Sequence, residues 1–75
     1  MSRLRDLRKF KKYTQEKIAE LSGIDQSDYS KIELGKRHLT FEQCKRLAVI
    51  LDTSMDYLAE LTDNPVPYER KKTMA

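Results

Sequence analysis

The sequence predicts an all-α domain of five short helices followed by a short irregular C-terminal tail. Apolar residues recur at helical spacing, whereas β-branched residues are scarce and no run alternates apolar with polar side chains. Capping residues and glycines interrupt this pattern at intervals that suit short helices. A chain of 75 residues can fill only one small core. We therefore expect one helical domain over residues 1–62 and an irregular basic tail over residues 63–75.

The first two predicted helices are separated by a capping residue. The first covers about residues 3–11, and its apolar stripe should comprise Leu4, Leu7 and either Phe10 or Tyr13. Thr14 fits the next N-cap, because its hydroxyl can accept from a free backbone N–H of the following turn. The second helix is QEKIAEL, with a buried face expected to comprise Ile18, Ala19 and Leu21. Gly23 can take the left-handed conformation that ends it, and Ile24 can fill the space between two crossing helices.

The third predicted helix, QSDYSKIE, is poor in core-forming residues. Asp25 caps it and Gly35 ends it, and Tyr29 and Ile32 form its narrow apolar face. Two short helices joined by a three- to four-residue turn that contains glycine are typical of a helix-turn-helix. In that motif the second helix is polar because its outer face contacts a partner.

The last two predicted helices also begin at caps. Thr40 and Gln43 have the spacing of a capping box, and Ser54 precedes the fifth helix, MDYLAEL. The inner stripe of the fourth helix should comprise Phe41, Cys44, Leu47, Ala48 and Leu51. Pro65 and Pro67 prevent the fifth helix from continuing into the tail.

Composition argues against several classes of protein. One cysteine and one histidine provide neither an internal disulfide nor a zinc-ligand set, and they do not form a nucleophile, base and orienting group. We expect no enzymatic activity, metal or cofactor, and no small-molecule ligand is evident. The longest apolar run, residues 47–51, is far too short to span a membrane, and the start lacks the apolar block of a signal peptide. These features predict a cytoplasmic protein that does not associate with membranes.

The charge of the chain is unevenly distributed. The formal net charge is +3, but residues 1–12 carry six basic side chains and one acidic side chain. The segment over residues 13–65 is acidic, and the tail is basic again. Charge alone leaves two interpretations open, a solvated surface with salt bridges and a surface for a polyanion.

The central part of the chain resembles a known family. The stretch TQEKIAELSGIDQSDYSKIELGKRHLTFEQCKRLAVILDTSMDYL is similar to the five-helix DNA-binding domain of the Xre/Cro and lambdoid-repressor type. The matching features are Thr14-Gln15, Ala19, Gly23 and the string Ile32-Glu33-x-Gly35-Lys36, and the resemblance covers about residues 4–61. Two residues depart from the pattern, since Lys12 stands where the family often has glycine and Leu39 stands where it commonly has proline.

The resemblance implies a sequence-specific transcriptional regulator of double-stranded DNA, a repressor. It would read the major groove with its third helix and bind a palindromic operator as a homodimer. The alternative is an antitoxin-like or other protein-interaction module that uses the same fold.

Base-reading residues are expected in the first two turns of the third helix, and our candidates are Gln26, Ser27 and Lys31. Glutamine can donate to and accept from adenine, and lysine can reach the acceptors of guanine. Simple solvation of these side chains is the alternative. Asp28 and Asp25 are interpreted as helix caps, because a carboxylate in the groove is repelled by phosphates.

Phosphate contacts are expected from helix starts and from the loop after the reading helix. The candidates are Thr14, Gln15, Ser30, Lys36 and Arg37, with His38 as an exposed neighbour. For the N-terminal cations Arg3, Arg5, Lys9, Lys11 and Lys12, phosphate contact and solubilising charge remain equally open.

Two further sets have structural roles. The resemblance implies that Arg8 pairs with Glu33 and so holds the first helix to the end of the third. A dimer interface is expected at Ile50, Met55, Tyr57 and Leu61, unless these side chains complete the monomer core. Cys44 lies on the core stripe and is expected to be a packing thiol.

Overall fold

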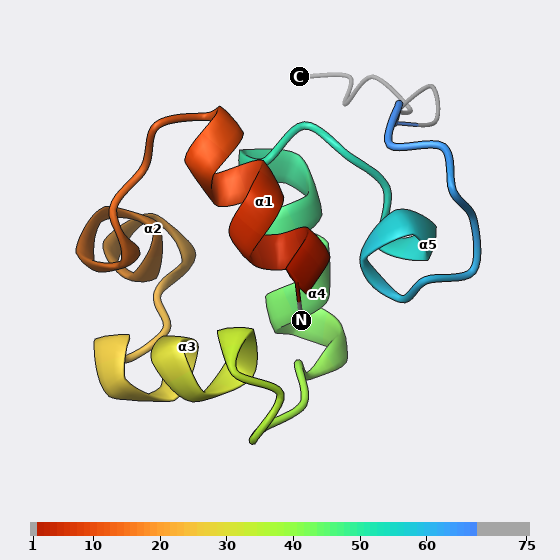
Figure 1. The fold of residues 1–75 in the computed structure, drawn as a ribbon. Coiled ribbons are helices and arrows are strands. Elements are labelled where there is room, and N and C mark those ends of the chain that lie inside the picture. Colours follow the sequence, from red (N-terminus) through yellow and green to blue (C-terminus); the bar gives the residue numbers. More distant parts are fainter. Residues whose placement is uncertain (1, 68–75) are drawn as a thin grey trace, which may run out of the picture.

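A computed structural model describes residues 2–67 of the chain and contains five helices and no strand within them (Figure 1). The helices are α1 (Ser2–Phe10), α2 (Gln15–Ser22), α3 (Gln26–Glu33), α4 (Phe41–Ile50) and α5 (Met55–Leu58). The predicted all-α fold class is confirmed. Residues 63–67 form no helix, and residues 68–75 of the predicted tail lie outside the described residues.

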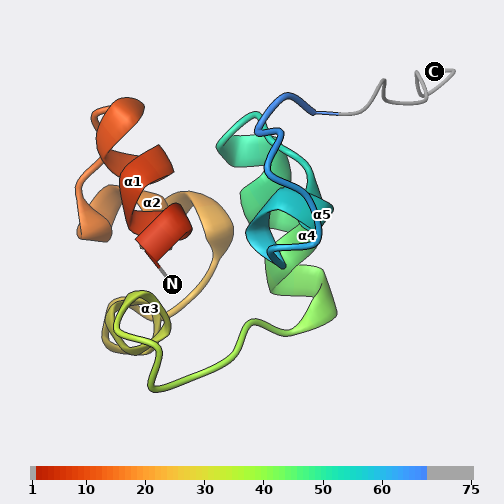
Figure 2. The same ribbon diagram turned by 45° about the vertical axis from the view of Figure 1, so that its right-hand side comes forward.

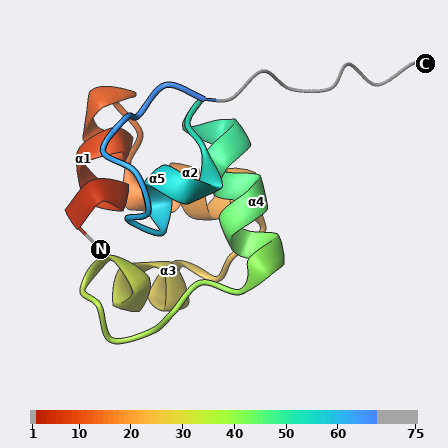
Figure 3. The ribbon, with the colours of Figure 1, turned by 90° about the vertical axis from the view of Figure 1, so that its right-hand side faces the viewer.

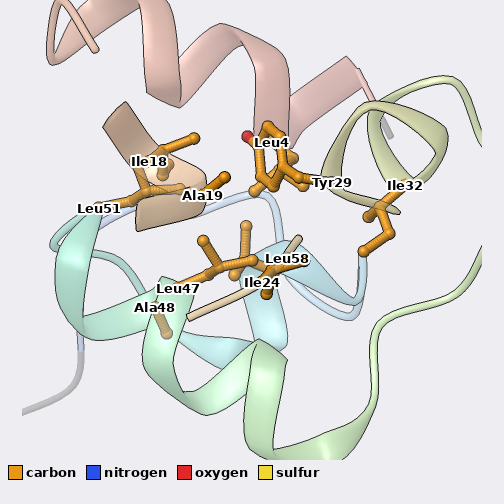
Figure 4. Close-up of a cluster of buried hydrophobic side chains, with 10 residues drawn as sticks. All are labelled: Leu4, Ile18, Ala19, Ile24, Tyr29, Ile32, Leu47, Ala48, Leu51 and Leu58. Carbon is orange, nitrogen blue, oxygen red and sulfur yellow. The ribbon is translucent and has the colours of Figure 1, made fainter. Parts of the chain in front are cut away.

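The five helices enclose one core. Figure 2 shows α1, α2 and α3 on one side of the molecule and α4 with α5 on the other. Buried apolar side chains from all five helices meet between these two groups (Figure 4). The buried apolar residues are Leu4, Ile18, Ala19, Ile24, Tyr29, Ile32, Leu47, Ala48, Leu51 and Leu58. The core therefore joins the N-terminal and C-terminal halves of the domain.

All four predicted N-caps are present. The Thr14 hydroxyl accepts from the backbone N–H of Lys17 at 3.0 Å, and the Asp25 carboxylate accepts from that of Ser27 at 3.2 Å. Thr40 and Gln43 form the reciprocal capping box. Ser54 caps α5 by accepting from the N–H of Tyr57 at 3.0 Å. These contacts satisfy backbone donors that have no partner inside a helix.

Two residues expected in the core are exposed instead, Leu21 at 44% and Phe41 at 70%. Of the two alternatives for the end of the α1 stripe, Phe10 is 78% exposed and Tyr13 packs against the core. Phe10, Leu21 and Phe41 each lie in the first or last turn of a helix. Ser22 takes the buried position expected for Leu21, and its hydroxyl donates to the carbonyl of Ile18 at 2.7 Å.

The turn after α1 explains why Tyr13, not Phe10, extends the apolar stripe. Lys12 adopts a left-handed conformation with φ of 62°, which reverses the chain so that the N–H of Tyr13 donates to the carbonyl of Arg8 at 3.0 Å. Tyr13 then packs against the core. The turn thus uses the geometry that glycine adopts most easily, although lysine occupies the position.

The fifth helix is shorter than the sequence predicted. It ends at Leu58, and Glu60 adopts a φ of 64°, which a helix cannot contain. The N–H of Leu61 then donates to the carbonyl of Asp56 at 2.8 Å and closes the turn. Leu61 therefore lies beyond α5 and not on its last turn.

Arg3 joins the start of α1 to the chain around α5. Its Nη1 donates to the carbonyls of Tyr57 at 2.8 Å and Thr62 at 2.6 Å, and its Nη2 donates to Asp63 at 2.8 Å. The guanidinium also lies 4.4 Å from the centre of the Tyr57 ring, within cation–π distance. Arg3 is therefore engaged within the protein and is not a free N-terminal cation.

The left-handed residue at position 12 generates a stability prediction. Lys12→Gly should raise the free energy of unfolding by about 0.5–1 kcal/mol, because glycine adopts positive φ without the steric penalty of a Cβ atom. Urea unfolding followed by circular dichroism measures this change. Lys12→Ala is the control, since it removes the charge but keeps the Cβ atom and should give no gain. A glycine variant no more stable than the alanine variant would contradict the prediction.

Candidate nucleic-acid interface

The helices α2 and α3 form a tight pair. Residues 23–25 join them, and Gly23 adopts a φ of 71°, the left-handed conformation expected for this position. The N–H of Ile24 donates to the carbonyl of Ala19 at 3.0 Å, and both side chains are buried between the helices. The small Ala19 side chain allows the close approach, and Ile24 fills the remaining space. This pair has the form of a helix-turn-helix.

The third helix has one buried face and one polar face. Tyr29 and Ile32 point into the core, where they are almost completely buried. The predicted base-reading residues Gln26, Ser27 and Lys31 are all exposed. Figures 1 and 3 show α3 at one end of the molecule, away from residues 63–67. The polar face of α3 is therefore available to a partner.

A shallow polar hollow lies where α2 and α3 begin. It is lined by Gln15, Asp25, Gln26, Ser27 and Ser30. Two of the predicted base-reading residues are thus beside two of the predicted phosphate contacts, and the free N–H groups of two helix starts are nearby. Lys31 is outside the hollow, farther along α3. The Thr14 hydroxyl is already engaged as a cap.

The loop between α3 and α4 carries exposed cations on the same end of the molecule (Figure 2). Lys36 and His38 are exposed, and Gly35 gives the turn its positive φ of 78°. The Nη1 of Arg37 donates to the carboxylate of Asp28. The sequence interpretation assigned Asp28 a capping role and missed this ion pair. A separation of nine residues across a loop has no sequence signal that identifies it.

Arg8 and Glu33 form the forked pair that the family resemblance implied. Nε of Arg8 donates to Oε2 of Glu33 at 2.6 Å, and Nη2 donates to Oε1 at 3.2 Å. Both residues are buried. Arg8 also donates to the carbonyl of Tyr13 at 2.9 Å, and the Gln15 amide donates to Oε1 of Glu33 at 3.1 Å. Gln15 thus contacts the buried pair as well as the polar hollow.

The environment of the pair shifts its ionisation. Burial alone would raise the pKa of the Glu33 carboxyl, but the hydrogen bonds from Arg8 and Gln15 outweigh burial and lower it. The hydrogen bond to Glu33 raises the pKa of Arg8. Since the pKa of Glu33 is lower in the folded state, its stabilising effect is complete above the ordinary carboxyl pKa. That effect is lost as the pH falls through the lowered pKa.

Two other groups have raised pKa values. The hydroxyl of Tyr29 is buried, and burial raises the pKa of Tyr29. Burial also raises the pKa of the Cys44 thiol, which packs against the core as a half-buried side chain. A raised pKa keeps the thiol protonated, as expected for a packing residue.

The predicted dimer residues have mixed exposure. Leu61 is 77% exposed, whereas Ile50, Met55 and Tyr57 are half-buried. Ile50 and Met55 pack against the core, and Tyr57 lies under the Arg3 guanidinium. Tyr57 also lines an open apolar groove with Leu7, Phe10, Leu51, Val66 and other residues. The structure therefore leaves a partly apolar surface around α5, and the exposed Leu61 follows this helix.

The fold and this surface define a helix-turn-helix DNA-binding domain. The family model described as "Helix-turn-helix" matches residues 4–58, and the chain belongs to this Xre/Cro-type family of transcriptional regulators. No helix within residues 2–67 combines the length and the hydrophobicity needed to cross a membrane.

Three relatives from Bacillus subtilis (strain 168) support the assignment. The chain is 39% identical over 72 residues to the uncharacterized HTH-type transcriptional regulator YobD, covering 96% of this chain and 64% of YobD. It is 36% identical over 73 residues to the uncharacterized HTH-type transcriptional regulator YqaE, covering 95% of this chain and 63% of YqaE. It is 35% identical over 60 residues to the SPbeta prophage-derived uncharacterized HTH-type transcriptional regulator YonR, covering 80% of this chain and 56% of YonR. The chain thus spans less than two thirds of the length of these relatives. No solved structure shows a significant match.

The buried pair generates a prediction about stability. Arg8→Ala and Glu33→Ala should each lower the free energy of unfolding by roughly 3–5 kcal/mol, because each leaves a buried charge without its partner. The double variant should lose less than the sum of the two single variants. Urea unfolding measures all three variants, and Arg5→Ala, at an exposed position of α1, is the control. Arg8→Lys and Glu33→Gln replace the alanine variants if those do not fold. Strict additivity would show that the two side chains do not stabilise each other.

Proposed function

We propose that the protein is a sequence-specific double-stranded DNA-binding regulator that reads the major groove with α3. The observation that carries this proposal is the polar hollow at the starts of α2 and α3, which brings Gln15, Gln26, Ser27 and Ser30 together. Side chains in the first turns of such a helix meet base edges, and free backbone N–H groups at a helix start attract phosphate. One surface thus offers both kinds of contact that a DNA-reading helix needs.

The proposed DNA contacts of this surface divide into two groups. Gln26, Ser27 and Lys31 read bases. Phosphates are contacted by Thr14, Gln15, Ser30, Lys36 and Arg37. The capping of α2 engages the Thr14 hydroxyl, so its proposed contact uses the backbone at the helix start. Arg8 and Glu33 contact no DNA in this arrangement and fix the angle of α3 instead.

We also propose that the protein binds a palindromic operator as a homodimer and acts as a repressor. One module of this size buries about 600–1,000 Å² on DNA, which is modest for selecting one site among many. A two-fold dimer adds the contacts of two modules when its reading helices lie about 34 Å apart. Leu61, with Ile50, Met55 and Tyr57, supplies the proposed dimer surface. In this proposal the dimer occupies a promoter, blocks transcription from it and acts in the cytoplasm.

The alternative is a protein-interaction module in which the polar face of α3 contacts another protein. The salt dependence of binding to bulk DNA distinguishes the two, because phosphate contacts release counterions and make the affinity fall steeply with salt. A protein that binds only other proteins lacks this dependence.

The proposed roles predict two different effects on DNA binding. Gln26→Ala should cost roughly 1–3 kcal/mol on the preferred operator and relax the preference at one base pair, because it removes a contact to a base edge. Lys36→Ala should lower the affinity for all DNA sequences by the same factor, since a phosphate contact carries no sequence information. Fluorescence anisotropy with a set of operator variants measures both effects. Lys9→Ala, in the last turn of α1, makes the same change of net charge as Lys36→Ala and should have a smaller effect. An unchanged ranking of operator variants in Gln26→Ala would refute its base-reading role.

The proposed dimer predicts a defined stoichiometry. Analytical ultracentrifugation should show two protomers on each palindromic operator, and Leu61→Asp should reduce the affinity for the full site more than for a half-site, because a charge disfavours an apolar interface. Phe41→Asp is the matched control, since Phe41 is an exposed apolar residue at the start of α4, outside the proposed surface. One protomer per full site at saturation, with no dimer of the free protein at high micromolar concentration, would overturn the dimer.

A further inference from the structure

An ion pair lies within the proposed DNA-reading surface. Asp28 is in the first turn of α3, and Arg37 is in the loop that follows this helix. The Arg37 guanidinium donates to the Asp28 carboxylate, and their side chains are 55% and 37% exposed, respectively. Ser27 and Lys36, the sequence neighbours of the pair, are both proposed DNA contacts. The pair is therefore accessible and close to the expected path of the duplex.

This pairing conflicts with a simple phosphate-binding role for Arg37. A guanidinium that contacts a carboxylate is partly neutralised, so its attraction for phosphate is reduced. If Arg37 turns to a phosphate, Asp28 is left as an unpaired carboxylate beside a polyanion and is repelled. Contact between Arg37 and DNA therefore carries an electrostatic cost that Lys36 does not share.

That cost depends on what DNA offers to Asp28. The exocyclic amine of cytosine is a donor in the major groove and can donate a hydrogen bond to an aspartate. A phosphate or a base-edge acceptor has no hydrogen to donate to Asp28. At a site with a suitably placed cytosine, Asp28 accepts a hydrogen bond from the cytosine amine in place of the one from Arg37. Arg37 then moves to a phosphate. At other sites Asp28 has no replacement donor, and the ion pair is retained.

We infer that Asp28 is a specificity-determining residue that withholds Arg37 from DNA of arbitrary sequence and releases it at an operator that presents a cytosine amine. This inference rests on the proposed function of α3. Asp28 acts in two ways, through its own contact with the base and through the position of Arg37. It lowers the affinity for nonspecific DNA more than the affinity for the operator.

The experiment compares Asp28→Asn, Arg37→Ala and the double variant on two probes. One probe is a duplex of random sequence, and the other is the preferred operator obtained by selection from a random duplex library. Asp28→Asn should bind the random duplex about three- to tenfold more tightly at low salt, because it releases one cation and removes one anion. The slope of log affinity against log salt should steepen by about 0.9, which corresponds to one additional phosphate contact. The preference for cytosine at one operator position should weaken.

The controls separate release of Arg37 from a general change of charge. Glu16 is an exposed carboxylate in the first turn of α2, and no described residue forms a salt bridge with it. Glu16→Gln therefore makes the same change of net charge without freeing an arginine, and it should leave the salt slope unchanged. The double variant should also have the same salt slope as Arg37→Ala alone. Circular dichroism confirms folding of each variant, and Asp28→Ser replaces Asp28→Asn if the latter is unstable.

Three outcomes decide the inference. A steeper salt slope in Asp28→Asn alone, together with a weaker cytosine preference, supports it. The inference is overturned if Asp28→Asn and Glu16→Gln change the salt slope equally. It is also overturned if Asp28→Asn changes the slope equally in the wild-type and Arg37→Ala backgrounds. Both outcomes leave the proposed function intact. A wild-type protein that binds neither probe in a salt-dependent manner refutes the proposed function itself.

Discussion

The buried pair between Arg8 and Glu33 is the interaction on which the position of α3 depends. This helix contributes only Tyr29 and Ile32 to the apolar core, so packing alone defines its orientation weakly. The fork fixes two atoms of the carboxylate at the end of α3 against the end of α1, and Gln15 adds a contact from the start of α2. One carboxylate thus orients three helices. A hydrophobic replacement could match the stability of the pair, but it would lack the directional hydrogen bonds that set an angle.

Arginines and lysines have different uses in this domain. Arg3, Arg8 and Arg37 donate hydrogen bonds within the protein, as does Arg46, whose Nη1 donates to the carbonyl of Ser22 at 3.3 Å. The planar guanidinium can reach several acceptors at once, which makes it suited to joining segments. Lys31 and Lys36 are exposed, and a flexible ammonium suits contacts to a groove or a phosphate. The net charge of the chain is therefore a poor guide to its attraction for DNA.

The accuracy of the sequence predictions depended on how local each feature is. The four caps and the glycine turns were correct, because a cap or a left-handed turn involves residues only a few positions apart. The burial expected for Leu21 and Phe41 was wrong, because hydrophobic periodicity does not show whether another element covers the first or last turn of a short helix. The contacts of Arg3 with residues after α5 span almost the whole chain, so no spacing could reveal them. The pairing of Arg8 with Glu33 came from the family resemblance and not from the spacing of the residues.

The helix α1 connects the two surfaces that the proposed regulator needs. Arg3, in its first turn, holds the carbonyl of Thr62 and the carboxylate of Asp63, and so fixes the chain beside the exposed Leu61. Arg8, five residues later, holds Glu33 at the end of α3. These arginines are only about 7.5 Å apart along a rigid helix, given a rise of about 1.5 Å per residue. In the proposed dimer, contact through Leu61 would therefore fix the reading helix of each protomer relative to the two-fold axis. Loss of the contacts of either arginine would then change the spacing of half-sites that the dimer accepts.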